Sequence, residues 1–274
     1  MAADPSARRA DAPSSRFRPH ARREPWILTY HSVTDAGDDP YGITVSPARL
    51  DEQLSWLRSR RLTGVGVAEL LRARAAGRRG LVGLTFDDGY ADFLGEALPV
   101  LRRHGCRATV FVLPGRPGGV NEWDPLGPRK PLLTREDVRR VAAAGMEVGS
   151  HGLYHRDLTA LGDEELHHET RHSRQLIGDL TGTPPEGFCY PYGVLDGRVA
   201  AAARSAGYGY ACALSPGPLL SRYALPRTHI SQADRGARLW AKDLRHGLRH
   251  GAVPGTAPAC APRAAGPVRT GGAR

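Results

Sequence analysis

Two adjacent carboxylates, Asp87 and Asp88, stand two residues after an apolar run, Leu81 to Leu84, that predicts a buried strand. Adjacent acids at a strand end repel each other and lose hydration, so we expect a cation to engage one while the other stays available as a base. His151 and His155 follow a second apolar run later in the chain. One aspartate and two histidines can hold a divalent metal with open positions for water and substrate, which is typical of a catalytic site.

Each motif alone is weak evidence. Asp-Asp-Gly is commonly a solvated turn, and two histidines four residues apart often lie on a helix surface. The second motif also differs from the His-Glu-x-x-His of zinc proteases, because Gly152 stands where the glutamate would be. The coincidence of both motifs at strand ends favours a site, since α/β sheets and barrels place their sites there.

The two motifs and a third one follow each other in a recognisable order: Thr85-Phe86-Asp87-Asp88-Gly89, Ser150-His151-Gly152-Leu153-Tyr154-His155 and Phe188-Cys189-Tyr190-Pro191-Tyr192-Gly193. From about residue 26 to 230 the chain resembles the polysaccharide deacetylases of the NodB-homology, carbohydrate esterase 4 family. The resemblance implies an α/β fold, a distorted (β/α) barrel of about seven or eight strands. It also implies metal-dependent removal of acetyl groups from N-acetylated sugars.

Carried over by position, the resemblance assigns roles to single residues. Asp87 would be the catalytic base, while Asp88, His151 and His155 would bind the metal. Tyr192, which follows Pro191, would offer its backbone N–H to the developing oxyanion. The ligand set suits one divalent ion, Zn before Co or Ni.

The third motif departs from the family pattern. Many members have an arginine there that pairs with the catalytic aspartate, and Cys189 occupies the matching position. We expect Cys189 to be a small buried side chain, because free cysteines are among the most buried residue types. Arg227, in Leu225-Pro226-Arg227, is a candidate to replace the missing cation.

The family's last motif, a Leu-x-His that supplies the general acid, is absent near the end of the core. Ile27-Leu28-Thr29-Tyr30-His31, at the start of the chain, is instead an apolar run ending in histidine. This arrangement resembles the circularly permuted branch of the family, as in poly-N-acetylglucosamine deacetylases. His31 would then be the acid and would face the site from the side opposite Asp87. A hydrogen-bonded core histidine is the alternative.

Alternating elements predict a single barrel that positions these residues. The expected strands are 26–31, 63–67, 81–86, 108–113, 146–150, 187–191, 208–213 and 224–230. The expected helices are 47–59, 68–76, 92–103, 134–144, 163–181 and 196–206. Residues 114–131, rich in Gly and Pro, predict a long loop over the barrel mouth. Trp123 and Asp124 in this loop either contact a sugar ring or have only a structural role.

The net charge of +10 lies outside the core. Residues 1–25 contain six arginines against three acids, residues 235–274 contain eight basic residues against one acid, and the core 26–234 is neutral. We therefore expect a barrel over 25–234, disordered basic tails at 1–24 and 252–274, and no specific nucleic-acid partner. Residues 235–251 predict a basic amphipathic helix, which either contacts an anionic membrane or covers the barrel.

No apolar run is long enough for a transmembrane helix, and no signal-peptide segment is evident, so we expect a cytoplasmic protein that is at most peripheral at a membrane. The four cysteines show no CxxC spacing and are expected to be free thiols. The motifs and the family resemblance together predict metal-dependent N-deacetylation of a carbohydrate or glycoconjugate that contains N-acetylhexosamine. The alternatives are an amidohydrolase of the same fold acting on a small cyclic amide, and a catalytically weak carbohydrate-binding module.

Overall fold

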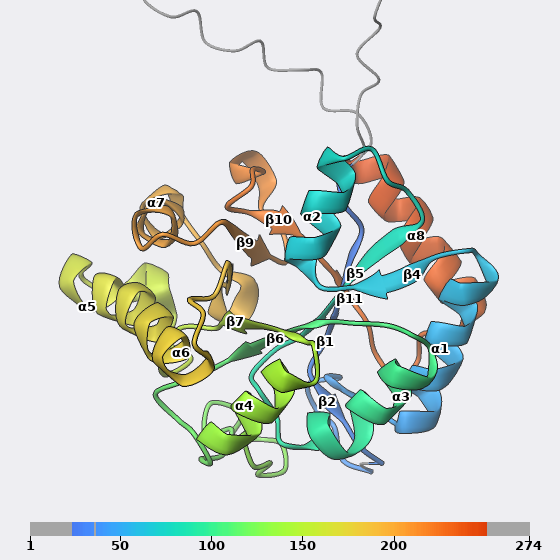
Figure 1. The fold of residues 1–274 in the computed structure, drawn as a ribbon, viewed down its shortest axis with the longest axis horizontal. Coiled ribbons are helices and arrows are strands. Elements are labelled where there is room, and N and C mark those ends of the chain that lie inside the picture. The colour runs from blue at the N-terminus through green and yellow to red at the C-terminus, as the bar shows by residue number, and fades with distance from the viewer. Residues whose placement is uncertain (1–23, 36, 251–274) are drawn as a thin grey trace, which may run out of the picture.

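A computed structural model describes residues 24–35 and 37–250, arranged as a barrel-shaped sheet with helices around it (Figure 1). The tails expected at 1–24 and 252–274 lie outside the described residues, apart from Glu24. Among the described residues, no helix is long and apolar enough to cross a membrane.

The sheet is parallel, and eight of its strands follow one another in the order β10-β9-β8-β7-β6-β5-β1-β11. A ninth, β4, pairs with the beginning of β5. Most of the strands are short runs that are buried on both faces, as is typical of parallel sheets, whereas β11 at the end of the row is partly exposed. Their bounds are β1 Ile27–Tyr30, β4 Thr63–Val65, β5 Leu81–Phe86, β6 Thr109–Val112, β7 Glu147–Ser150, β8 Gly187–Cys189, β9 Tyr210–Ala213, β10 Leu225–Pro226 and β11 Thr228–His229.

The two ends of this row meet at Arg227. Leu225 of β10 is in register with Cys212 of β9, whereas Thr228 of β11 is in register with Leu28 of β1. The segment 225–229 therefore pairs with β9 at one end of the row and with β1 at the other. This nearly closes the barrel and confirms the predicted fold, including the N-terminal strand beside 224–230.

Helices cover the sheet, and local signals explain where several begin. Ser46 accepts a hydrogen bond from the Arg49 amide at the start of α1, and Thr134 forms a capping box with Asp137 at the start of α4. The helices are α1 Pro47–Ser59, α2 Val67–Ala75, α3 Leu98–Arg103, α4 Arg135–Ala143, α5 Asp163–His167, α6 Ser173–Thr181, α7 Gly197–Ser205 and α8 Gly236–His250.

Three details differ from the sequence-based elements. The helix expected over 92–103 begins as a π-helical segment, Phe93–Ala97, and the one over 163–181 contains another, His168–His172. A small sheet of β2 (Ser32–Val33) and β3 (Thr44–Val45) was not expected, because two-residue strands leave no periodic pattern.

Among the described cysteines, all three are free thiols, as predicted.

Candidate active site

Three strand ends bring the predicted chemical residues together. Asp87 and Asp88 follow β5, His151 follows β7, and His31 follows β1. All strand pairs are parallel, so these residues meet at the carboxyl edge of the sheet. They line a cleft of about 220 Å³, with Tyr41, Ile43, Trp123, Asp124, His155, Tyr190, Tyr192, Gly193, Leu214 and Arg227.

Two overlapping groups could hold a metal: Asp88 with His151 and His155, and Asp87 with His151 and Cys189. Because Arg227 already pairs with Asp87, the first group is the better candidate. The ligating atoms of Asp88, His151 and His155 all lie within 4.8 Å of one another. Asp88 Oδ1 is 3.3 Å from the Nε2 atom of each histidine, and it is buried without a hydrogen-bond partner among the described residues. A buried carboxylate oxygen without a donor, facing two imidazole nitrogens, fits a cation at their centre.

Backbone conformation and outer contacts hold this triad. Asp88 and His155 have positive φ angles of 68° and 59°, which are uncommon for residues with a Cβ and frequent at functional sites. Nδ1 of His151 lies 2.8 Å from the Cys189 carbonyl oxygen. With its proton on Nδ1, His151 turns the Nε2 lone pair towards Asp88 and His155, as metal-binding histidines do.

Charge also favours an ionised triad carboxylate. Burial alone would raise the pKa of Asp88, but the neighbouring imidazoles of His155 and His151 outweigh it and hold that pKa well below its usual range. His155 is buried, and this lowers its pKa despite the nearby Asp88 carboxylate. Burial would lower the pKa of His151, but Cys189 and Asp88 outweigh it and raise that pKa well above its usual value. A divalent ion binding here would therefore displace a proton from His151.

Asp87 has a separate set of partners. Arg227 donates a hydrogen bond of 2.7 Å from Nη1 to Asp87 Oδ1, and the Cys189 thiol lies 3.6 Å from Oδ2. Both partners are buried. Burial would raise the pKa of Asp87, but Arg227 is the main opposing influence, ahead of His151 and His31, and the pKa falls below its usual value. The Cys189 thiol stays neutral, because burial raises its pKa to about 11.

His31 is beside Asp87, with Nε2 at 3.9 Å from Oδ2. The expectation that it faces the site from the opposite side is wrong, because β1 and β5 are neighbours and Tyr30 is in register with Phe86. Nδ1 of His31 is buried and makes no hydrogen bond to a described residue. His31 is therefore held by its strand and its neighbours, and Nε2 is the nitrogen near Asp87.

Aromatic side chains form the wall next to His155. The Trp123 ring stacks on the His155 ring with centroids 4.4 Å apart, and the Tyr192 ring meets it edge-on at 4.5 Å. Tyr192 follows Pro191 in a turn with φ of 58°, and its side chain is half exposed at the cleft. Trp123 thus supports a possible metal ligand, a contact that its place in a long loop did not indicate.

Sequence reasoning missed Glu169. Its Oε2 accepts backbone hydrogen bonds from Leu153 (2.6 Å) and Tyr154 (3.3 Å), the residues between His151 and His155. The side chain occupies the space beside Gly152, where an added Cβ would lie 2.9 Å from Oε2. In sequence, Glu169 is one acid among several on a charged helix, and nothing there distinguishes it from its exposed neighbours.

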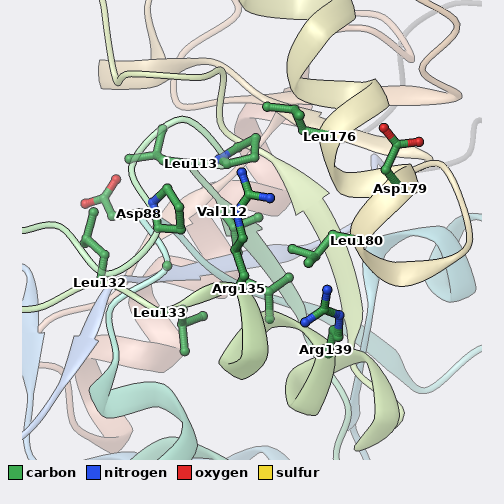
Figure 2. A pocket seen from close by; sticks show the side chains of 14 residues that line it. Asp88, Val112, Leu113, Leu132, Leu133, Arg135, Arg139, Leu176, Asp179 and Leu180 are labelled. Atoms are coloured by element: carbon green, nitrogen blue, oxygen red, sulfur yellow. The ribbon is translucent and has the colours of Figure 1, made fainter.

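A second cavity lies behind the turn that carries Asp88 (Figure 2). It has a volume of about 150 Å³ between α4 and α6, and its walls are mostly apolar, with the charged side chains of Arg135, Arg139 and Asp179 among them. Of the residues that line it, only Asp88 belongs to a possible metal-ligand group among the described residues.

Comparisons with known proteins identify related sequences. A family model described as polysaccharide deacetylase matches residues 74–211. A putative polysaccharide deacetylase, YxkH of Bacillus subtilis, is 27% identical over 221 residues, which cover 78% of this chain and 74% of the relative. The poly-beta-1,6-N-acetyl-D-glucosamine N-deacetylase of Escherichia coli K12 is 29% identical over 150 residues, which cover 47% of this chain but only 21% of that enzyme.

Solved structures share the fold. The Streptococcus pyogenes deacetylase PplD, determined in complex with acetate, superimposes with a TM-score of 0.66 at 21% identity. The superposition covers 80% of this chain and 97% of PplD. At this identity the likeness establishes the barrel architecture and leaves substrate to be argued from the site.

Proposed function

We propose that this chain, which belongs to the polysaccharide deacetylase family, is a metal-dependent hydrolase that removes N-acetyl groups from a carbohydrate or glycoconjugate containing N-acetylhexosamine. The observation that carries the proposal is the pairing of two different aspartates in one cleft. Asp88 faces two histidines, and Asp87 faces a buried arginine. Asp88 is thus suited to bind a cation, and Asp87 is suited to accept a proton.

Hydrolysis of an acetamide must overcome a poor electrophile and a poor leaving group. A divalent cation held by Asp88, His151 and His155 would polarise the carbonyl and lower the pKa of water. Asp87 would take the proton of the attacking water, and its contact with Arg227 supports an ionised, oriented base. The sequence-based choice of Zn, with Co or Ni as alternatives, rests on the ligand types.

The remaining steps concern charge on the carbonyl oxygen and on the departing nitrogen. The backbone N–H of Tyr192 would donate to the oxyanion, an interaction of a kind that contributes about 3 to 4 kcal/mol in other hydrolases. Protonated His31 would donate to the amine nitrogen. His31 Nε2 lies 3.9 Å from Asp87 Oδ2. This distance supports the roles of acid and base, because both side chains can then reach atoms of the same tetrahedral centre.

The experiment is acetate release from N-acetylglucosamine oligosaccharides, measured with the metal-free protein and after addition of Zn, Co or Ni. Metal-dependent release of acetate supports the proposal. Turnover of cyclic amides without activity on sugars would favour the small-molecule amidohydrolase. Binding of oligosaccharide without turnover at any metal concentration would favour a carbohydrate-binding module. The cytoplasmic location expected from the sequence remains a prediction.

A further inference from the structure

Helix α8 has a buried side and an exposed apolar side. Leu239 and His246 are buried on the side towards the barrel, where the helix packs near α1. Trp240, Leu244 and Leu248 are 49%, 46% and 77% exposed. Residues four apart lie above one another on a helix, so these three side chains form one stripe along the outside of α8.

Cations border this stripe. Arg238, Arg245 and Arg249 are exposed on the same helix. With 3.6 residues per turn, they form a band directly beside the apolar stripe, on the side away from Asp243. A helix that presents an apolar stripe and an adjoining basic band suits the boundary between lipid headgroups and acyl chains.

The chain termini add basic sequence at one end of this helix. The Glu24 amide donates a 3.1 Å hydrogen bond to the His250 carbonyl oxygen, so the first and last described residues are in contact. Before Glu24 the sequence has six arginines and two acids, and after His250 it has three arginines and no acid. Figure 1 shows both ends of the coloured chain meeting at the end of α8.

We propose that the exposed face of α8, defined by Trp240, Leu244, Leu248 and the three bordering arginines, docks onto an anionic phospholipid membrane. The apolar stripe would enter the interface, and the arginines would pair with phosphate groups. The cleft residues belong to other elements, and His31 and Asp87 follow the carboxyl ends of strands, whereas Glu24 precedes the amino end of β1. Docking through α8 therefore leaves the cleft open to substrate.

The test is cosedimentation of the full chain with vesicles of phosphatidylcholine alone and of phosphatidylcholine mixed with phosphatidylglycerol. We expect binding to the anionic vesicles that weakens at about 1 M salt, where the Debye length is only about 3 Å. Replacing Arg238, Arg245 and Arg249 by Gln should lower partitioning on the order of 100-fold, since each basic side chain near the surface contributes roughly a five-fold factor. Trp240→Ser with Leu244→Ser and Leu248→Ser should lower it at least as much.

A matched control is Leu126→Ser, because Leu126 is 75% exposed on the loop before α4. It should bind vesicles as the wild type does. Thermal unfolding and hydrolysis of a small soluble ester should be unchanged in the α8 variants, which shows that they fold. Equal binding by wild type and the serine variant would overturn the proposal. Two other results would also overturn it. In the first, the wild type does not bind vesicles but forms a dimer in sedimentation, and the serine variant is a monomer. In the second, the arginine variant loses binding to duplex DNA but binds vesicles as the wild type does.

Discussion

Arg227 donates a 2.7 Å hydrogen bond to Asp87, although the two residues are 140 positions apart in the chain. The contact exists because Arg227 lies between β10 and β11, where the barrel closes beside β1. Cys189, at the position of the family's arginine, touches the other carboxylate oxygen of Asp87. The cation beside Asp87, the proposed base, therefore comes from the segment between β10 and β11 and not from the end of β8.

Arg227→Leu should lower kcat for deacetylation strongly, because Asp87 is left buried without its cation. Removing one partner of a buried pair costs about 3 to 5 kcal/mol, so unfolding is measured alongside activity. Exposed Arg204→Leu is the control. Cys189→Arg in the Arg227→Leu background returns a cation to Asp87 from β8 and should recover part of kcat. A folded Arg227→Leu protein with wild-type kcat would show that Arg227 does not position the base.

Asp87→Asn should reduce turnover by about 10² to 10⁴, the usual contribution of a general base. Its metal content, measured by elemental analysis after dialysis, should match the wild type, because Asp87 is not among the converging ligands Asp88, His151 and His155. Loss of metal in this variant would show that the two aspartates exchange roles.

His155→Ala should abolish tight metal binding, since a ligand of the converging triad is lost. Metal at 100 times its dissociation constant stabilises a folded protein by about 2.7 kcal/mol, and the variant should lose this increment in thermal unfolding with added Zn. His168→Ala, an exposed histidine of the same chain, should keep it. Equal Zn affinity in the His155 variant and wild type would refute the ligand assignment.

His31→Ala should slow amide hydrolysis far more than hydrolysis of an activated aryl acetate. The amine must be protonated to leave, whereas the aryl oxide needs no proton. The ratio of the two rate losses is the measurement, and Asp87→Asn, which impairs attack on both substrates, is its comparison. Equal losses on both substrates would contradict the role of His31 as general acid and favour the alternative of a core histidine.

Glu169→Ala should weaken metal binding about 10- to 100-fold, the usual effect of removing an outer partner of a metal site. The variant leaves the amides of Leu153 and Tyr154 without their acceptor, so the turn between the two histidines relaxes. Calorimetric titration of Zn measures the change, and exposed Glu164→Ala is the control. Glu169→Gln keeps an acceptor oxygen and should lie closer to wild type. An unchanged Zn affinity in Glu169→Ala would show that Glu169 does not position the metal ligands.

The amino-acid sequence is enough to predict the barrel and the main residues of the candidate site. Apolar runs such as Leu81 to Leu84 predict buried parallel strands, and polar residues directly after them must collect at one edge of the sheet. The positions of Asp87, Asp88 and His151 in the sequence therefore predict that they lie together. His31 could be added because the N-terminal strand takes the place of a terminal one.

The side chains that surround these residues could not be predicted from the sequence, because they come from distant segments that meet in the folded barrel. Arg227 reaches Asp87 because of barrel closure, and Glu169 reaches the turn after His151 from a π-helical segment that leaves no periodic signal. The pattern of α8 predicted an amphipathic helix, but packing decided that Leu239 faces the barrel and Trp240 faces outward. Local periodicity specifies an element and its faces, whereas contacts between distant segments depend on strand order and closure, which no local pattern contains.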